Sequence, residues 1–304
     1  MRLEELARAA PFARPLAVPD WTLGCFHRRS ITYANGLEDA ATRVIWIQSH
    51  GLTGDLRIPA RRPDVGGLAG LADCPREALV ELAKGEGGVA DTAFAEGRMS
   101  WSNWAAFQPY DKWPEPGDLR RVGPALIEFA PSGIYVEDWR LQPGSAGLLV
   151  GLRLVSEARS GGAHLPRDGG LVISGDHAIF ALARREDLPA GRPVHRQVAD
   201  AADPTALARQ AFDAQAAYAR RDAEGDYRIV LAVDPFAEGR ALALDDFAPA
   251  GEGELLQSLD DGTERRWRID TLLAGQPGST ATAAEAQAAA WLSQEADTLL
   301  VAAR

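Results

Sequence analysis

The segment RVIWIQSHGLTGDLRIP, residues 43–59, decides the fold class. Residues 43–49 are rich in β-branched and aromatic side chains, which favour a strand. The turn-forming residues 50–54 follow, and residues 55–59 read as a second strand. Pro59 ends that strand or lies at a sheet edge, because proline has no N–H to donate to a neighbouring strand. The segment therefore predicts an antiparallel hairpin.

The same arrangement of short apolar runs and turns recurs along the chain, whose 30 glycines and 19 prolines are spread over its whole length. Further strands are expected at residues 125–129, 134–139, 148–156, 170–174, 178–184, 215–221, 227–233, 240–244 and 265–272. Short helices are expected at residues 75–84, 204–211 and 282–300, although residues 298–301 read equally well as a last strand. Strands at such short intervals are typical of barrels and sandwiches, so the predicted fold class is mainly β with a few short helices.

Residues 157–170 are rich in glycine and polar side chains and are expected to form a loop. We place a domain boundary there. An N-terminal β-barrel domain is expected at residues 15–158 and a C-terminal β-barrel domain at residues 159–304. A loose duplication of hairpins in the two halves suits two barrels.

Composition excludes several classes of protein. The 304 residues are 46% hydrophobic and 25% charged, which is ordinary for a folded soluble protein. The formal charge of −11 repels phosphate backbones, so no nucleic-acid partner is expected. No apolar run is long enough to cross a bilayer, the first residues do not resemble a secretory signal, and two cysteines are too few for a disulfide framework. We therefore expect no membrane association and a cytoplasmic location.

Motifs for cofactors and metals are missing from the sequence. It contains neither a G-x-x-x-x-G-K-[ST] nor a G-x-G-x-x-G phosphate loop, and neither a G-x-S-x-G nor an H-E-x-x-H motif. The five histidines are isolated from one another, and the carboxylates of residues 245–254 lack the ordered oxygen ligands of an EF-hand loop. No cofactor and no metal site are therefore expected.

Four of the expected strands each have one aliphatic side and one side that mixes aromatic with polar residues. The mixed sides carry Trp46, Gln48, Arg57, Glu128, Tyr135, Glu137 and Trp139. Either these sides meet water while the aliphatic sides form the core, or they line the lumen of a barrel. Alternating strands are common, which favours the first geometry. Large aromatics such as Trp46 and Trp139 are rarely left on open surface beside charges, which favours the second, so both geometries stay open.

In a lumen, the mixed sides would bind a small amphipathic or aromatic ligand through Trp46, Gln48, Arg57, Tyr135 and Trp139. Desolvation would raise the pKa of Glu128 or Glu137 and suit either of them to general acid or base catalysis. Arg57 would pair with one of these carboxylates or with an anionic ligand. The alternative is an Arg–Glu pair across strands that only satisfies buried charge. Trp101 and Trp104 are three residues apart, which suits a turn or loop at the end of a barrel better than one strand face.

The order of these motifs resembles the fungal casein-kinase-interacting protein family and its bacterial relatives. The resemblance is carried by Trp46-x-Gln48, residues 55–59, Trp101-x-x-Trp104 and Glu137-Asp138-Trp139, and it extends from about Trp46 toward the C-terminus. Residues 64–90 and a C-terminal extension depart from the family pattern. The resemblance implies two lipocalin-like, calycin-type β-barrels, and it implies no catalytic residues because no reaction is attached to the family.

Three functions are compatible with these observations. The first is binding of a small, partly apolar molecule in the N-terminal barrel. The second is a metal- and nucleotide-independent enzyme, such as an isomerase, cyclase, dehydratase or hydrolase, that uses Glu128 or Glu137 in the same cavity. The third is a protein-interaction module with a protein partner or a homodimer. An enclosed cavity beside Trp46 and Glu137 favours the first two, and a filled barrel favours the third.

Overall fold

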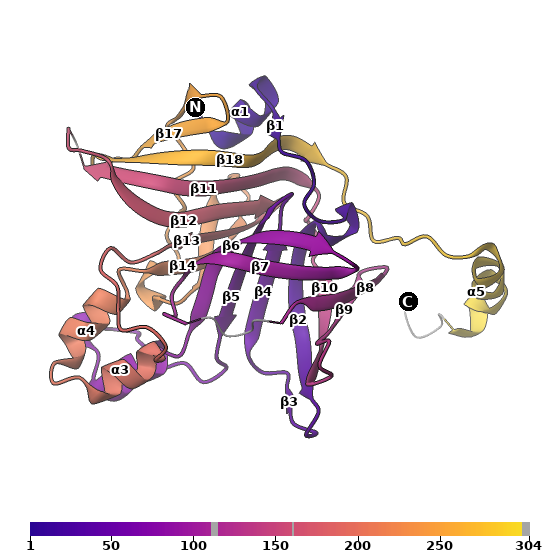
Figure 1. Cartoon of the computed structure of the whole chain (residues 1–304), viewed down its shortest axis with the longest axis horizontal. Helices are drawn as coiled ribbons and strands as arrows, with labels where there is room; N and C mark the ends of the chain where they lie inside the picture. The colour runs from indigo at the N-terminus through magenta and orange to yellow at the C-terminus, as the bar shows by residue number, and fades with distance from the viewer. Residues whose placement is uncertain (111–114, 160, 300–304) are drawn as a thin grey trace.

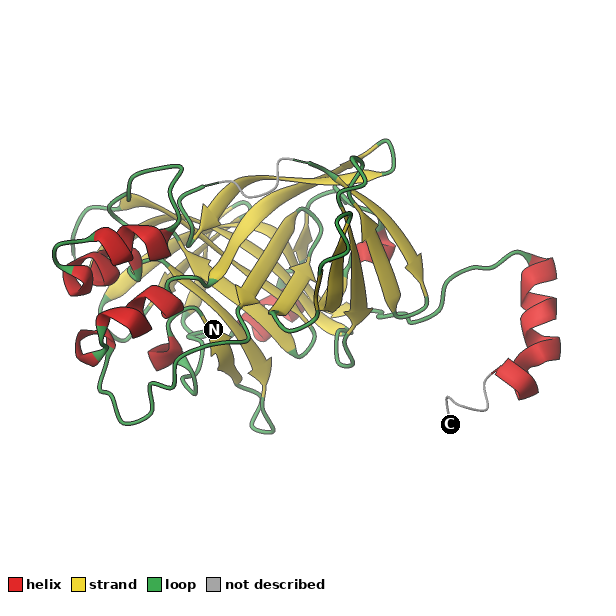
Figure 2. Cartoon of the chain, turned by 90° about the horizontal axis from the view of Figure 1, so that it is seen from below, coloured by secondary structure: helices red, strands yellow, loops and turns green. Residues whose placement is uncertain are grey.

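The computed structural model describes residues 1–110, 115–159 and 161–299. It confirms that the protein is mainly β, with two antiparallel sheets that lie against each other (Figures 1 and 2). Apart from β1 (Phe12–Ala13), which pairs with the second sheet, the chain completes the first sheet before it enters the second. The proposed domain limits, residues 15–158 and 159–304, stay a prediction.

The first sheet closes into a barrel of eight strands in the described part of the chain. These strands are β2 (Gly24–Tyr33), β4 (Arg43–Gln48), β5 (Leu52–Ile58), β6 (Glu86–Ala95), β7 (Arg98–Ala106), β8 (Gly117–Val122), β9 (Ala125–Phe129) and β10 (Tyr135–Leu141). Each strand pairs with the next, and β10 returns to pair with β2. The two-residue strand β3 (Glu38–Asp39) extends β2 as a hairpin.

The second sheet has the strand order β15-β14-β13-β12-β11-β18-β17-β16. Its strands are β11 (Gly147–Arg159), β12 (Leu165–Ser174), β13 (His177–Leu182), β14 (Gln215–Arg221), β15 (Tyr227–Ala232), β16 (Phe247–Gly251), β17 (Glu254–Ser258) and β18 (Thr263–Gln276), with β1 (Phe12–Ala13) paired to β18. Among the described residues, β15 and β16 are not paired with each other, and one isolated bridge joins Arg228 to Ala241. A second closed barrel and the calycin type therefore stay predictions.

The described residues form five α-helices and three short 3-10 helices outside the sheets. The 3-10 helices are Asp20–Thr22, Leu71–Asp73 and Pro235–Ala237. The α-helices are α1 (Leu3–Ala9), α2 (Arg76–Leu82), α3 (Val194–Asp200), α4 (Pro204–Ala211) and α5 (Ala286–Leu299). Helices α2, α3 and α4 pack together at one end of the molecule, while α5 lies away from both sheets (Figures 1 and 2). The expected start of α4 is confirmed, because the Asp203 side chain accepts a hydrogen bond from the Ala206 N–H and Pro204 opens the helix. No helix in the described ranges is both long and apolar enough to span a membrane.

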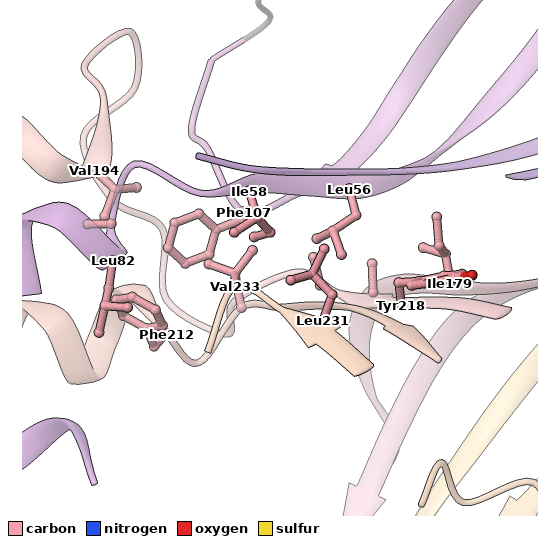
Figure 3. Packing of buried hydrophobic residues seen from close by; sticks show 14 of the residues in the cluster. Leu56, Ile58, Leu82, Phe107, Ile179, Val194, Phe212, Tyr218, Leu231 and Val233 are labelled. Atoms are coloured by element: carbon pink, nitrogen blue, oxygen red, sulfur yellow. The ribbon is translucent and has the colours of Figure 1, made fainter. Parts of the chain in front are cut away.

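The aliphatic sides of the first hairpin pack against the second sheet (Figure 3). Leu56 and Ile58 of β5 lie in one buried cluster with Ile179 of β13 and Leu231 of β15. The sheets approach closely at Gly54, where a Cβ atom would lie 2.8 Å from the Cβ of Ile179. Because the aliphatic side of the hairpin packs between the two sheets, the opposite side, with its aromatic and polar residues, faces the barrel lumen.

Several sequence predictions of local structure are wrong. Residues 157–170 are not one loop, because β11 continues to Arg159 and β12 begins at Leu165. Residues 240–244 form no strand and take part only in the isolated bridge at Ala241. Residues 298–299 end α5, and residues 300–301 lie outside the described residues. Strands β2, β6, β7, β8, β16 and β17 and helices α1 and α3 were not anticipated, because glycine, alanine and polar residues in these segments weaken the periodic pattern.

Candidate functional site

A cavity of about 910 Å³ occupies the barrel lumen. Strands β4 to β7, β9 and β10 supply its wall, and residues 183–191, which follow β13 of the second sheet, supply part of its rim. Its aromatic, charged and amide-bearing lining residues among those described are Trp46, Asp55, Arg57, Glu86, Trp101, Asn103, Trp104, Gln108, Tyr110, Glu128, Tyr135, Glu137, Trp139, Arg184 and Asp187.

Strand β10 shows how the sequence places its side chains in the lumen. Tyr135, Glu137 and Trp139 are buried, whereas the intervening Val136 and Asp138 are half-buried. This alternation is that of a strand with one face inside the barrel. Strand β9 alternates in the same way, with Leu126 and Glu128 buried and Ala125 and Ile127 half-buried.

Six of the seven predicted site residues line the cavity: Trp46, Arg57, Glu128, Tyr135, Glu137 and Trp139. Gln48 does not, because its amide nitrogen donates to the carbonyl oxygens of Ser49 (2.9 Å) and Leu52 (3.1 Å) and holds the turn between β4 and β5. The ligand-binding and catalytic roles assigned to these residues stay predictions.

Aromatic rings form one end of the cavity. The ring centroids of Trp46 and Trp139 are 5.8 Å apart at an interplanar angle of 67°, an edge-to-face arrangement. Phe26 stacks on Trp46 with a centroid distance of 5.2 Å. Leu126 and Met99 are buried in the same cluster. The lumen is therefore filled at this end, and the open volume begins at the two tryptophans.

A β-bulge brings Trp101 and Trp104 into the same cavity. Both lie in β7, so the expectation of a turn or loop is wrong. The register between β6 and β7 shifts by one residue here, and Asn103 adopts a left-handed conformation with φ of 53°. The extra residue of a bulge re-aims the following side chains, which lets residues three apart share one face.

Two carboxylates of the site have arginine partners within hydrogen-bond distance. Glu137 accepts from Arg28 (2.7 Å), whose other terminal nitrogen binds Asp39 (2.8 Å). Asp55 accepts from the Nε atom of Arg57 (2.8 Å). Arg57 therefore binds a carboxylate on its own strand, two residues away, and not Glu128 or Glu137 as expected. Burial lowers the pKa of Arg57, but the charges of Asp55 and Glu137 outweigh it and raise that pKa overall.

Glu128 differs from these two carboxylates. It is 5% exposed, lies directly opposite Glu137 in the pairing of β9 with β10, and accepts a hydrogen bond from the Tyr135 hydroxyl (2.9 Å). Burial, followed by the charge of Glu137, raises the pKa of Glu128 to about 8. At neutral pH, Glu128 is therefore mostly the neutral acid and can give up a proton within the lumen.

The Trp139 indole N–H lies close enough to Glu128 to favour its charged form. The N–H is buried, and no acceptor among the described residues is placed to complete a hydrogen bond with it. Burial and the neighbouring Glu128 raise the pKa of Tyr135 above its usual range, so the phenol stays protonated as a donor. Glu128 is thus surrounded by groups that can donate to a carboxylate.

Some residues of the site were not predicted from the sequence. Arg28 lies in β2, a strand whose pattern is too mixed to recognise, although its place beside Glu137 follows from the pairing of β2 with β10. The rim from residues 183–191 is held by contacts distant in sequence, including the Gly191 N–H to the Pro109 carbonyl (3.1 Å). No local signal marks such contacts.

Among the described residues, no three histidine, cysteine or acidic side chains are arranged to hold a metal ion. The described side chains of the site offer proton donation from Glu128, hydrogen bonding and aromatic contact.

Comparison with known proteins does not assign the chain to a family. No protein-family model and no curated protein matches the chain. Among solved structures, the chain is similar to the uncharacterised Saccharomyces cerevisiae protein YLR301w, with 9% sequence identity and a TM-score of 0.48. The match covers 81% of this chain and 96% of that chain. A similarity at this level carries no argument about fold or activity, and the resemblance to the casein-kinase-interacting family stays a prediction.

Proposed function

We propose that the barrel cavity binds a small, partly apolar molecule. The observation that carries this proposal is the cavity of about 910 Å³ with Trp46, Trp101, Trp104 and Trp139 in its lining. Small-molecule sites usually have volumes of about 300–1,000 Å³, with aromatic walls and a few polar groups that fix orientation. Tyr135 and Glu128 would supply such polar groups here.

The proposal is tested by fluorescence titration with N-phenyl-1-naphthylamine, a neutral apolar dye. We expect saturable binding, and Trp104→Ala should weaken it by about tenfold through loss of aromatic contact. Trp104 is 37% exposed, so this variant should remain folded. Trp46→Ala removes a buried wall of the cavity and serves as a second variant if circular dichroism shows that it is folded.

Trp291→Ala is the matched control, because Trp291 is 56% exposed on α5, away from the barrel (Figure 1). Its affinity for the dye should equal that of the unmodified protein. Absence of saturable binding, or equal losses in Trp104→Ala and Trp291→Ala, would contradict the assignment of binding to the cavity.

A second candidate function is acid–base catalysis by Glu128. The observation that favours it is a pair of opposed carboxyl groups in different environments, since Glu137 pairs with Arg28 whereas Glu128 holds a proton at neutral pH. Glu128 would donate this proton to a bound substrate and later regain it, as an isomerase, cyclase, dehydratase or hydrolase requires. Glu137 would not transfer a proton itself; its charge would raise the pKa of Glu128.

This candidate is tested by incubating the protein with a small-molecule extract and following products by mass spectrometry. Products that form with the unmodified protein should be absent with Glu128→Gln, while dye binding is retained. Full product formation by Glu128→Gln would exclude Glu128 as the acid.

The remaining expectations belong to the same proposal. We propose that both sheets are calycin-type barrels of the casein-kinase-interacting family and that the protein works in the cytoplasm. The order of the sequence motifs around Trp46, Trp101 and Glu137 supports the family and its barrels, and the composition of the chain supports the cytoplasmic location. A protein partner or a homodimer is a further alternative, tested by size-exclusion chromatography with light scattering.

A further inference from the structure

The described residues that line the cavity carry more acidic than basic side chains. The acidic ones are Asp55, Glu86, Glu128, Glu137 and Asp187, and the basic ones are Arg57 and Arg184. Asp55 and Glu137 have their charge balanced by Arg57 and Arg28 at 2.8 and 2.7 Å. Within the described ranges, no ion pair involves Glu128, although this carboxyl is only 5% exposed.

The surroundings of Glu128 are nevertheless suited to its ionised form. The Tyr135 hydroxyl donates to Oε1 at 2.9 Å, and the Trp139 N–H beside the carboxyl has no acceptor in the part of the chain that the structure describes. Two donors stabilise a carboxylate better than a neutral acid. What keeps the proton on Glu128 is burial and the nearby charge of Glu137. A positive charge placed next to Glu128 would offset both effects.

Aromatic side chains border the same space. Trp46 and Trp139 lie at its inner end, and Trp101 and Trp104 lie along β7. The faces of indole rings attract cations, and the attraction grows when the cation is removed from water. We propose that the ligand of this cavity is an organic cation, an aromatic or alkyl ammonium whose charged group lies against Glu128 and the tryptophans. This inference rests on the proposed binding function.

An anionic ligand fits the same site less well. Arg57 already donates from Nε and one terminal nitrogen to Asp55 at 2.8 and 3.4 Å. Arg184 donates to the Phe107 carbonyl, and its Nε has no partner among the described residues, but Asp187 and Asp213 oppose its charge. An anion would therefore have to compete with Asp55 and would lie near the charge of Glu137.

The test uses three probes that share an indole ring and differ in charge: tryptamine, tryptophol and indole-3-acetate. Calorimetric titration near neutral pH should show tryptamine binding about tenfold more tightly than tryptophol, with indole-3-acetate weakest. Glu128→Gln should reduce the affinity for tryptamine to that for tryptophol and leave tryptophol unchanged. Glu285→Gln is the matched control: it makes the same substitution at an exposed residue outside the cavity and should keep the preference.

Titration in two buffers of different ionisation enthalpy supplies a second readout. Binding of tryptamine should release a proton to the buffer, because the ammonium group favours ionised Glu128. The described groups that face Glu128 are Tyr135, Glu137, Arg57 and Trp139. Glu128→Gln should abolish this release, and tryptophol should release no proton.

The outcomes separate this inference from the proposed binding function. If tryptophol or indole-3-acetate binds as tightly as tryptamine, the inference of a cation is wrong and the cavity remains a binding site. If none of the three binds while N-phenyl-1-naphthylamine does, the inference is again wrong. If the dye also fails to bind, both proposals fall.

Discussion

Replacement of Glu128 by glutamine should stabilise the protein at neutral and alkaline pH. Glutamine has nearly the same shape, and its Oε1 atom can still accept the Tyr135 hydroxyl hydrogen bond (2.9 Å). The substitution removes the free energy of keeping a proton on a buried carboxyl that would ionise in the unfolded chain.

The size of the effect follows from the pKa of Glu128, which rises from 4.5 to about 8 on folding. Because the folded pKa is the higher one, this carboxyl contributes fully to stability only below its unfolded pKa and loses that contribution as pH rises toward 8. A pH of about 7 lies roughly 2.5 pH units above the unfolded pKa, and each unit lowers the free energy of unfolding by about 1.36 kcal/mol. At about pH 7 this carboxyl has therefore lost about 3 kcal/mol of its contribution to stability. Near the unfolded pKa the loss is under about 1 kcal/mol.

Urea unfolding measures this difference directly. Free energies of unfolding for the unmodified protein and Glu128→Gln should differ little at about pH 5 and by about 3 kcal/mol, in favour of glutamine, at about pH 7. Asp187→Asn, at an exposed position, should show no such dependence on pH. A gap that is constant with pH, or a less stable glutamine variant above about pH 7, would refute the reasoning.

Two further substitutions test the packing around the site. Glu137→Gln should lower the free energy of unfolding by about 2 kcal/mol, because the Arg28 side chain is buried and would keep only Asp39 as an ion-pair partner among the described residues. Equal stability in urea would contradict the contribution of this ion pair. Gly54→Ala should cost about 1–3 kcal/mol because its Cβ would lie 2.8 Å from Ile179, whereas Gly275→Ala, with no atom within 4 Å, should leave the thermal midpoint unchanged.

The alternation of side chains allowed the lumen to be predicted from the sequence. In β4, β9 and β10, side chains two residues apart lie on the same side along the whole strand. Their spacing alone therefore groups Trp46, Glu128, Tyr135, Glu137 and Trp139 on one side. A period of two is set by the strand itself, which is why it survives in the folded protein.

Contacts between distant segments could not be predicted in the same way. The partner of Glu137 is Arg28, 109 residues earlier, and it follows only from the pairing of β2 with β10, which no local pattern indicates. The predicted pairing of Arg57 with Glu128 or Glu137 is wrong, because Asp55 lies on the same face of β5 two residues away and binds Arg57 at 2.8 Å. The bulge at Asn103 breaks the period of two, so Trp101 and Trp104 were assigned to a loop.

Closure of the barrel by β10 has a consequence for how the protein folds. This strand is the last of the barrel to be synthesised, and it must find β2, whose Arg28 lies 109 residues from Glu137. Pairings this distant form slowly, because a long loop must be closed before any contact compensates for the lost entropy. Since β10 also carries Tyr135, Glu137 and Trp139, the cavity exists only in chains that have completed the barrel. A molecule that binds there would therefore select finished chains and raise the yield of refolding.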